Sequence, residues 1–432
     1  MQSESTSSRF VDAFLPLGMA TDQLQVALTG ADLTHHVAIL GTVAGRAWED
    51  VMVMEQVRQG GGFVVFDLWP TPQRQNQFAR SLHAANRGRD LYVIDLARPE
   101  QSDRWSPTVA GTVEEVVTKL MALCPPATGA ADREELAKAL HMVVASLREA
   151  RARFTLSDVA VLLHSGKALS DMCEGLPVGA QRQKLTQWLR ILGGTPNETQ
   201  AELSRIAGRY VARLDAITEA SGSHVLNTAL PTLDVSALMA AGKCLYVPVL
   251  RHDEASSALA RMLCVEIQQA LAHPNATPQT TPYLLFMGDL GRAIPIARGL
   301  VEQATAAGVG LVLTMSGDEA TTDGVGFTTA LLKSARTQII CGGNSMALNS
   351  VAGFLGQDDK TSILMRNNTM QLLVRPEAPS APVVETLQQK HLPLGLAPGE
   401  TILDFDRRFN DVSTGSEDRT TFAMPAMSMT AH

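Results

Sequence analysis

Short apolar runs rich in Val, Ile and Leu recur along the chain, and most of them lack alternating polar positions. Strands of a parallel sheet are covered on both faces, so they lose the in-and-out alternation of a half-exposed strand. The pattern predicts seven buried strands, at residues 36–41, 62–67, 90–95, 244–250, 283–287, 310–314 and 337–341. Helix-spaced apolar segments separate most of them, at residues 48–59, 257–272, 294–307 and 326–335. Strands that alternate with helices predict an α/β fold with a mostly parallel central sheet.

A long helical stretch interrupts this alternation between the third and fourth predicted strands. Residues 112–233 carry almost no strand signal, and their apolar spacing predicts helices at 133–152, 156–164 and 198–220. Thr155 and Ser157 mark one expected helix start, because hydroxyl side chains accept hydrogen bonds from the free N–H groups there. We therefore expect an all-α insertion at residues 112–233, within a domain formed by residues 1–111 and 234–415.

The residue types that bind soft metals are scattered without a ligand pattern. An odd number of cysteines without any C-x-x-C pair predicts reduced, buried thiols instead of disulfides or a zinc site. These cysteines are Cys124, Cys173, Cys244, Cys264 and Cys341. His35 and His36 have no partner at ligand spacing, so we expect them in the core or at the strand entry. Residues 416–432 hold spaced methionines in a polar, aperiodic segment, which predicts a disordered tail in preference to a soft-metal site.

Composition and charge describe an ordinary soluble globular protein. The 432 residues are 45% hydrophobic, 19% charged and 5% aromatic, which excludes disorder over most of the chain. The 36 basic and 44 acidic side chains give a net charge of −8, so no global positive field attracts nucleic acid. Basic clusters at residues 148–153, 205–213 and 407–408 could form a local patch, but helical spacing beside acidic residues is more typical of solvated faces. Without a signal-peptide pattern or a sufficiently long apolar run, we expect a cytoplasmic location and no membrane span.

The segment from His36 to Trp48 carries the most informative chemical pattern, a strand that leads through a glycine-containing turn into a helix. A nucleotide hydrolase places its phosphate loop, G-x-x-x-x-G-K-[ST], at such a junction. Here Gly41 and Thr42 open the turn, and Gly45 is followed by Arg46 instead of lysine. The next residue is alanine, so the hydroxyl that would serve Mg²⁺ is also missing.

With its surroundings, the chain resembles the coupling ATPases of type IV secretion and conjugation, the TraD/TraG kind, and more distantly the FtsK/HerA-like RecA-fold motors. The matching segments follow one another in order at residues 15–18, 33–36, 59–67, 154–158, 245–250, 283–291, 306–310 and 332–356. The resemblance spans about residues 15–405. It implies a RecA-like P-loop-type domain with an inserted all-α domain.

The chemical positions of that family are mostly lost in this sequence. Gly45 and Arg46 stand at the Gly-Lys of the phosphate loop, and Arg46 keeps the charge without the compact ammonium group. The family's Walker B strand ends in Asp-Glu, for the Mg²⁺ shell and the attacking water, but Gly288 and Asp289 stand there. Met315 replaces a polar sensor glutamine. Glycine at 342 or 343 replaces an arginine that follows a later strand.

The resemblance therefore implies a vestigial nucleotide site and no catalytic or metal-binding residue. The remnant site would consist of Gly41, Thr42, Gly45, Arg46, Asp67 and Asp289. Plainer roles remain open for two of these residues. Arg46 also fits a solvated, salt-bridged position at a helix start, and Asp289 also fits a cap of the turn after its strand.

These losses remove the charges that stabilise a transferring phosphoryl group. We therefore predict a non-catalytic, pseudo-ATPase component of a conjugation or type IV secretion system. It would recruit substrate or pair with an active coupling ATPase, and its partners would be secretion-system proteins, relaxosome components or effector substrates. ATP and Mg²⁺ are possible ligands, but no bound cofactor is expected, and DNA contact has little support.

Two other functions remain as alternatives. One is an active DNA-translocating hexameric ATPase with a variant phosphate site, which the missing lysine and Mg²⁺ carboxylate oppose. The other is an interaction scaffold outside secretion that uses the fold only as a platform. In the favoured interpretation the protein reaches the inner membrane peripherally, through its partners.

Overall fold

The computed structural model describes residues 13–19, 25–40, 43–124, 128–151, 153–250, 253–272, 281–288, 298–315, 335, 337–340, 370–374 and 383–387. All of them belong to one compact unit, Met1–Leu392. The second unit, Pro393–His432, lies outside the described residues. The predicted tail at 416–432 and the basic pair at 407–408 are part of that second unit.

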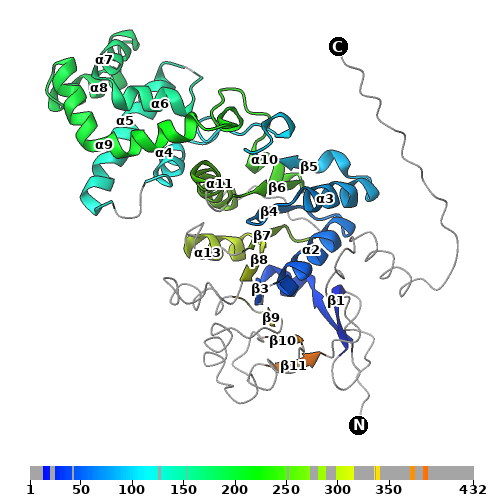
Figure 1. Ribbon diagram of the computed structural model, residues 1–432. Coiled ribbons are helices and arrows are strands. Elements are labelled where there is room, and N and C mark those ends of the chain that lie inside the picture. The colour runs from blue at the N-terminus through cyan, green and yellow to red at the C-terminus, as the bar shows by residue number, and fades with distance from the viewer. Residues whose placement is uncertain are drawn as a thin grey trace, which may run out of the picture. The chain divides into compact units, whose positions relative to one another are not determined.

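A nine-stranded sheet forms the centre of the unit, in the order β11-β10-β9-β3-β8-β7-β4-β6-β5 (Figure 1). Neighbours from β9 to β5 are parallel, while β10 and β11 extend the sheet in antiparallel fashion. The strands are β3 (Val37–Leu40), β4 (Phe63–Asp67), β5 (Leu91–Val93), β6 (Cys244–Pro248), β7 (Leu284–Gly288), β8 (Gly310–Met315), β9 (Thr337–Ile340), β10 (Met370–Val374) and β11 (Val383–Leu387). The seven predicted strands are thus confirmed as the parallel part of the sheet.

The pattern of apolar runs did not reveal four of the strands. Strands β10 and β11 were not predicted, and neither was a separate antiparallel hairpin of β1 (Ala13–Met19) and β2 (Gln25–Thr29). Proline and glycine interrupt the apolar residues of β1, and β2 has only three consecutive apolar residues between Gln25 and Thr29. Continuous apolar runs make buried parallel strands recognisable in a sequence, whereas the antiparallel strands β1, β2, β10 and β11 are harder to recognise.

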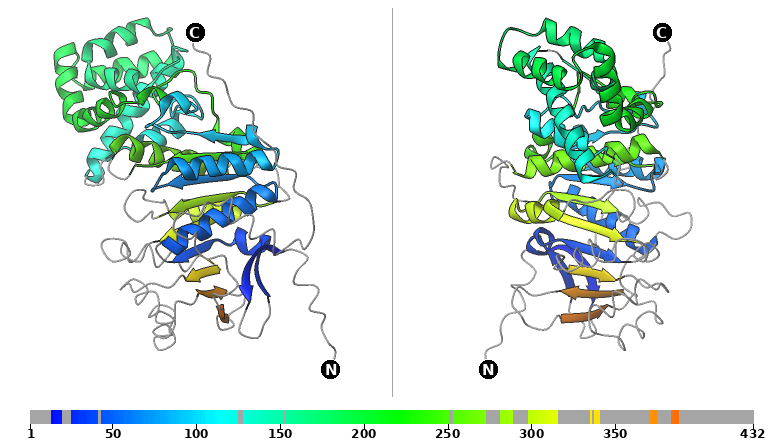
Figure 2. Two further views of the ribbon diagram at one scale, coloured as in Figure 1. Left: turned by 45° about the vertical axis from the view of Figure 1, so that its right-hand side comes forward. Right: turned by 90° about the vertical axis from the view of Figure 1, so that its left-hand side faces the viewer.

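Helices cover both faces of the sheet, with α2 and α3 on one face and α11 and α13 on the other (Figure 2). Their bounds are α1 (Gly30–Thr34), α2 (Val43–Arg58), α3 (Pro72–Ala84), α10 (Val235–Ala240), α11 (Glu254–Ala272) and α13 (Arg298–Ala306). The helices predicted at 48–59 and 257–272 correspond to α2 and α11, and α13 covers the described part of the helix predicted at 294–307. The helix predicted at 326–335 lies outside the described residues except for Ala335. Aromatic side chains fill the core between the layers, with Phe63 packed edge-on against both Phe78 and Phe286.

The region between β5 and β6 is helical, and no strand occurs in its described residues between 112 and 233. Its helices are α4 (Val113–Met121), α5 (Ala130–Glu149), α6 (Leu156–His164), α7 (Gly166–Gly175), α8 (Ala180–Ile191) and α9 (Pro196–Thr218). Three short 3-10 helices connect elements nearby, at Gly88–Asp90, Pro99–Gln101 and Ser223–Val225. Thr155 caps α6 as predicted, in a reciprocal capping box with Asp158. The predicted α/β fold with an all-α insertion is confirmed, while the exact domain boundaries remain predictions.

The described cysteines and His36 lie buried in the core. The four described cysteines are buried free thiols, as expected, and Cys341 lies outside the described residues. His36 is buried, and its Nδ1 accepts a hydrogen bond from the Leu311 N–H at 3.1 Å, which leaves the Nε2 proton to be donated to Thr305 Oγ1 at 2.8 Å. Within the described part of the chain, no group of three or more His, Cys, Asp and Glu residues is arranged to hold a metal ion. None of the described helices combines the length and apolar character of a membrane span.

Candidate functional site at the carboxyl edge of the sheet

The carboxyl ends of the parallel strands form the edge where the sequence places the remnant nucleotide site. Only residues 41 and 42 separate β3 from α2, so the helix has already begun where a phosphate loop would still be turning. Gly45 and Arg46 consequently lie in the first turn of α2. Gly41, Thr42 and Asp289 lie outside the described residues, which leaves Asp67 as the one predicted site residue whose side chain is described.

Asp67 ends β4 and is 1% exposed, with both carboxylate oxygens engaged by other parts of the protein. Its Oδ1 accepts hydrogen bonds from the Trp69 N–H at 2.9 Å and from Arg74 at 2.7 Å. Its Oδ2 accepts a hydrogen bond from the Tyr246 hydroxyl of β6 at 2.6 Å. Burial, and next the charge of Asp67, raise the pKa of Tyr246, so the tyrosine stays neutral and donates. Both oxygens of the carboxylate are therefore engaged in contacts within the protein.

Arg74, from the first turn of α3, is a buried cation at this edge. Its three guanidinium nitrogens contact three different carboxylates, with Nη1 on Asp67 at 2.7 Å, Nη2 on Glu49 at 2.6 Å and Nε on Asp50 at 2.7 Å. Burial opposes the charged form of Arg74, but the carboxylates of Asp50, Glu49 and Asp67 outweigh it and hold the pKa of Arg74 above its ordinary value. We call these four residues, Glu49, Asp50, Asp67 and Arg74, the Arg74 cluster.

Glu49 connects the Arg74 cluster to the ends of strands β7 and β8. Its Oε2 accepts a hydrogen bond from Thr314 Oγ1 of β8 at 2.7 Å. The same oxygen lies 3.5 Å from the point where a Cβ on Gly288 would stand. A carboxylate from α2 thus reaches the end of β7, next to the glycine that stands at the first Walker B position.

The cluster is acidic overall, because three carboxylates face one guanidinium. Burial raises the pKa of Asp50 to about 6, and the neighbouring Glu49 and Asp67 add to this effect while Arg74 opposes it. Asp50 therefore gains a proton in mildly acidic solution, which brings the cluster closer to charge balance.

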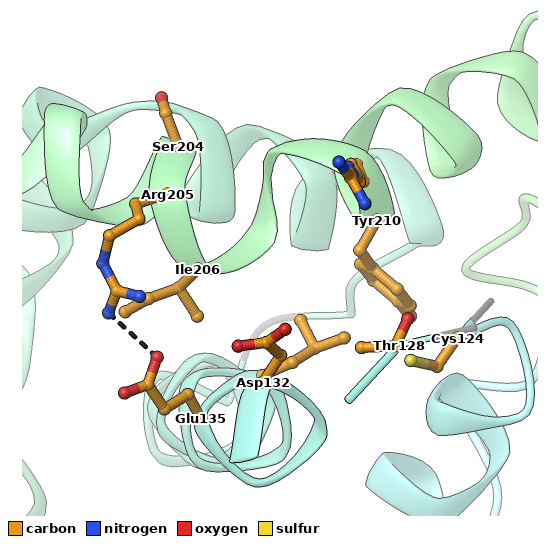
Figure 3. Close-up of a pocket in the computed structure, with 10 residues that line it drawn as sticks. Cys124, Thr128, Asp132, Glu135, Ser204, Arg205, Ile206 and Tyr210 are labelled. Atoms are coloured by element: carbon orange, nitrogen blue, oxygen red, sulfur yellow. Dashed lines mark hydrogen bonds and ion pairs between the residues drawn. The ribbon is translucent and has the colours of Figure 1, made fainter. Parts of the chain in front are cut away.

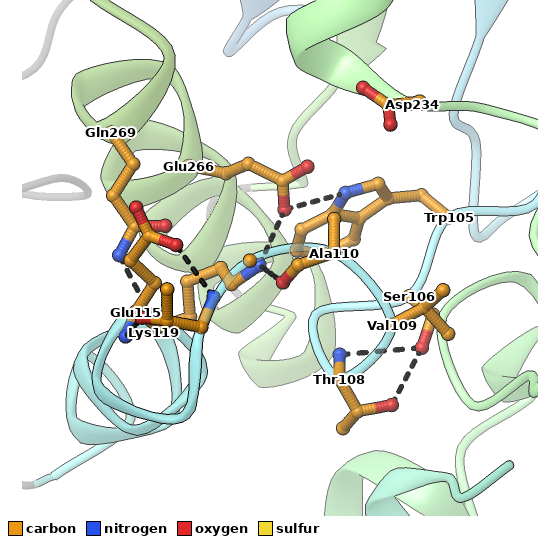
Figure 4. A network of polar contacts seen from close by, with 12 residues as sticks. Trp105, Ser106, Thr108, Val109, Ala110, Glu115, Lys119, Asp234, Glu266 and Gln269 are labelled. Atoms are coloured by element: carbon orange, nitrogen blue, oxygen red, sulfur yellow. Dashed lines mark hydrogen bonds and ion pairs between the residues drawn. The ribbon is translucent and has the colours of Figure 1, made fainter. Parts of the chain in front are cut away.

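A second buried ionic network lies at the junction with the all-α insertion (Figure 4). Lys119 of α4 is 1% exposed, and its Nζ donates to Glu266 Oε2 of α11 at 3.1 Å and to the Ala110 carbonyl at 2.8 Å. The Trp105 indole N–H donates to the same Glu266 oxygen at 3.1 Å. Burial raises the pKa of Glu266, although the charge of Lys119 opposes the shift. We call Trp105, Lys119 and Glu266 the junction network.

The chain enters and leaves the insertion through two segments that are hydrogen-bonded to each other. The Trp105 N–H donates to the Val225 carbonyl at 2.8 Å, and the Thr232 N–H donates to the Arg104 carbonyl at 2.8 Å. A side chain on Gly222 would collide with the Leu96 carbonyl oxygen, and this glycine has a φ of +82°, so glycine is required on both grounds. The two segments form a tight neck that ends in the junction network.

Three arginines of the basic clusters predicted at 148–153 and 205–213 bind carbonyl or carboxylate oxygens of the protein. Arg148 donates to the carbonyls of Thr108 and Val109, each at 2.9 Å. Arg205 forms ion pairs with Glu135 and Glu202, and Arg213 pairs with Glu254. These contacts agree better with structural and solvated arginines than with a nucleic-acid patch.

A pocket of about 400 Å³ lies between α5 and α9 of the insertion (Figure 3). The Arg205–Glu135 ion pair borders one side, and Tyr210 and Cys124 lie at the other. The Tyr210 hydroxyl donates to the Leu120 carbonyl at 3.0 Å, so it is already used. Carboxylates and guanidinium groups line the pocket together, and its charge favours no ligand class.

Comparison with known proteins supports the fold and leaves the chemistry open. No protein-family model and no curated protein matches the sequence. Among solved structures, plasmid coupling protein TrwB in complex with a non-hydrolysable GTP analogue is similar, with a TM-score of 0.54 and 12% identity over 84% of this chain and 88% of that chain. The conjugative coupling protein TrwBdeltaN70 in complex with sulphate gives 0.54 and 12% over 87% and 90%. VirB4 of Thermoanaerobacter pseudethanolicus gives 0.54 and 13% over 89% and 97%.

These likenesses define the class of the chain by its fold, a RecA-like α/β domain with an inserted helical domain. Within that class, the fold is that of the conjugative coupling proteins and VirB4. The resemblance expected from the sequence is thus confirmed at the level of fold.

Sequence reasoning missed the most highly connected residue of the site. Thr71 before Pro72 is a readable helix start, and it places Arg74 in the first turn of a helix. Nothing in the pattern indicates that carboxylates from α2 and β4 converge on it, because such convergence depends on tertiary packing.

Proposed function

We propose that this protein is a non-catalytic, coupling-protein-like component of a conjugation or type IV secretion system. It would recruit substrate or pair with an active coupling ATPase, with secretion-system proteins, relaxosome components or effectors as partners. The location we propose is cytoplasmic, with peripheral attachment to the inner membrane through these partners.

The observation that supports this proposal is that side chains at the carboxyl edge of the sheet bind one another, in a fold shared with coupling proteins. Asp67 is committed to Arg74, Tyr246 and the Trp69 N–H, and Glu49 is committed to Arg74 and Thr314. A phosphoryl-transfer site instead needs free donors and metal ligands aimed at the nucleotide. The sequence also lacks the lysine, the hydroxyl and the first Walker B carboxylate.

Binding and turnover of Mg²⁺-ATP by the purified full-length chain test the proposal. Calorimetry would measure binding, and phosphate release would measure turnover, with and without single-stranded and duplex DNA. An active coupling ATPase assayed in parallel is the positive control. We expect no turnover above the protein-free background in any condition, whereas DNA-stimulated turnover would establish a motor and contradict the proposal.

The secretion context needs its own experiment, because a silent ATPase site is also compatible with a scaffold elsewhere. Affinity capture of the tagged chain from its native cells, with and without the secretion genes, would identify partners by mass spectrometry. Recovery of a coupling ATPase, relaxase or secreted effector supports the proposal. Reproducible recovery of only unrelated proteins favours a scaffold outside secretion.

A further inference from the structure

Helix α8 of the all-α insertion has one face that no other described element covers. The helix packs against α5 and α7, and Leu185 is its buried residue. Its exposed residues are Ala180, Gln183, Lys184, Gln187, Arg190 and Ile191. At about 100° per residue these positions fall within about 120° of the helix circumference, so they share one side of the helix. We call these six residues the α8 face.

Two apolar side chains protrude at the ends of α8. Ile191 ends the helix and is 73% exposed, and Val178, in the loop before the helix, is 90% exposed. They are the two most exposed large hydrophobic side chains in the described part of the chain. The helix has 12 residues and is about 18 Å long, so the two side chains stand well apart. Such side chains gain the most from transfer out of water, because nearly all of their apolar surface is still hydrated.

Positive charge lies between these two apolar side chains. Lys184 and Arg190 are exposed, and neither forms an ion pair with a described residue. No Asp or Glu occurs at residues 175–197. By contrast, Arg205 on α9 is paired with Glu135. Because the whole chain has a net charge of −8, this local positive charge would select an anionic partner and turn the α8 face toward it.

We propose that the α8 face, together with Val178, is a peripheral contact for a membrane surface that contains anionic phospholipids. Val178 and Ile191 enter the boundary between head groups and acyl chains, while Lys184 and Arg190 contact head-group phosphates. Two separate protruding side chains fit lipid because lipid needs no preformed groove, whereas a protein partner must supply a pocket for each of them. With two apolar and two basic side chains the binding is weak and reversible. This direct contact goes beyond the attachment through partners proposed above.

Flotation of the purified full-length chain with lipid vesicles tests the contact. Mixed vesicles of phosphatidylethanolamine and phosphatidylglycerol are compared with vesicles of neutral phosphatidylcholine, at low and at high salt. We expect binding to the anionic vesicles only, and weaker binding at high salt because ions screen the attraction. Lys184→Ala combined with Arg190→Ala should lower the partition coefficient by about tenfold or more. Val178→Ser combined with Ile191→Ser should also lower it, but should leave its salt dependence unchanged.

Matched variants establish that the α8 face is the site of contact. Arg80→Ala combined with Arg89→Ala removes two exposed arginines from another part of the chain, and Val161→Ser removes an exposed valine from α6. Both control proteins should bind the anionic vesicles as the wild type does. All variants alter exposed side chains, so their melting temperatures should match that of the wild type. An equal decrease in the controls, or no binding of the wild type to anionic vesicles, overturns the inference.

The same variants distinguish lipid from an acidic protein as the occupant of the α8 face. If the wild type ignores vesicles, and Lys184→Ala combined with Arg190→Ala loses an acidic protein in affinity capture, the face binds protein and the lipid assignment is wrong. These outcomes are separate from the ATP assay. ATP turnover by the wild type would refute the proposed function even if the chain binds vesicles, and absence of vesicle binding would leave the non-catalytic role intact.

Discussion

The Arg74 cluster and the junction network are both buried ionic networks, but they differ in cation and in charge balance. In the Arg74 cluster, one guanidinium holds three carboxylates, and the network connects strands and helices at the edge of the sheet. In the junction network, one ammonium meets one carboxylate, and the pair joins α4 of the insertion to α11. The first is acidic, whereas the second is balanced.

The difference lies in how the remaining oxygens and protons are satisfied. Buried charges are tolerated only when hydrogen bonds complete their solvation. At the sheet edge, the hydroxyls of Tyr246 and Thr314 and the Trp69 N–H donate to the surplus carboxylate oxygens. At the junction, the Trp105 indole and the Ala110 carbonyl complete a neutral pair. An unbalanced network thus depends on every member, while a balanced pair can be exchanged as a unit.

The largest effect should follow from removal of the shared cation. Arg74→Met leaves three carboxylates without their counter-charge, and we expect a loss of roughly 4–5 kcal/mol in the free energy of unfolding. Urea denaturation would measure it. Arg80→Met, on the exposed part of the same helix, is the control and should change stability by less than about 0.5 kcal/mol. Similar losses for both variants would remove the distinction that we draw.

The junction network should show a smaller loss that a second substitution reverses. Lys119→Met leaves Glu266 buried with only the Trp105 donor, and we expect a loss of roughly 3 kcal/mol. Lys119→Met combined with Glu266→Leu replaces the pair by apolar groups and should recover most of that stability. Additive losses in this double-mutant cycle, measured by urea denaturation, would show that the pair is not an exchangeable unit.

Mild acid should change the stability of the Arg74 cluster through Asp50. The pKa of Asp50 is about 6 in the folded protein, above its ordinary value, because burial and the carboxylates of Glu49 and Asp67 outweigh Arg74. A raised pKa means that the folded state binds the proton more tightly, so this contribution to stability is lost as pH rises through 6 and is fully present below about pH 4. The stability difference between wild type and Asp50→Asn should therefore shift by about 2 kcal/mol between pH 4 and 7. A flat difference across this range would contradict the assignment.

His36 acts in the opposite direction and must be separated from Asp50. Burial lowers the pKa of His36 to about 4, so its contribution is present above about pH 6.5 and is lost as pH falls toward 4. Comparison of the wild type with Asp50→Asn at each pH cancels this term, because both proteins contain His36.

The smallest effect should come from the exposed ion pairs at the start of α11. Glu254 is 50% exposed and pairs with Arg213 and with Arg261. Glu254→Gln should cost less than about 1 kcal/mol, and high salt should diminish the difference from wild type. If Glu254→Gln lost as much stability as Lys119→Met, solvent exposure would not explain the difference between the Glu254 and Lys119 ion pairs with α11.

The parallel strands and main helices were predictable because their burial leaves a local record. The Phe63–Asp67 strand is apolar up to its last residue, and Thr155 with Asp158 marks a helix start. The contacts within the candidate site were much harder to predict from the sequence. Asp67 ends a predicted strand, but its partners Arg74 and Tyr246 come from different elements, and Thr314 of β8 contacts Glu49 of α2. No spacing rule connects these residues, since tertiary packing alone makes them neighbours.

The neck lowers the entropic cost of pairing β5 with β6. Strands β5 and β6 pair directly although residues 94–243 lie between them, which is a long loop to close in an unfolded chain. Once the helices between them have folded and Arg104 is hydrogen-bonded to Thr232, only the short stretches 94–103 and 233–243 remain to be closed. By the logarithmic dependence of loop entropy on length, this shortcut is worth roughly 2 kcal/mol. In the assembly of the sheet, the whole insertion then behaves as an ordinary surface loop.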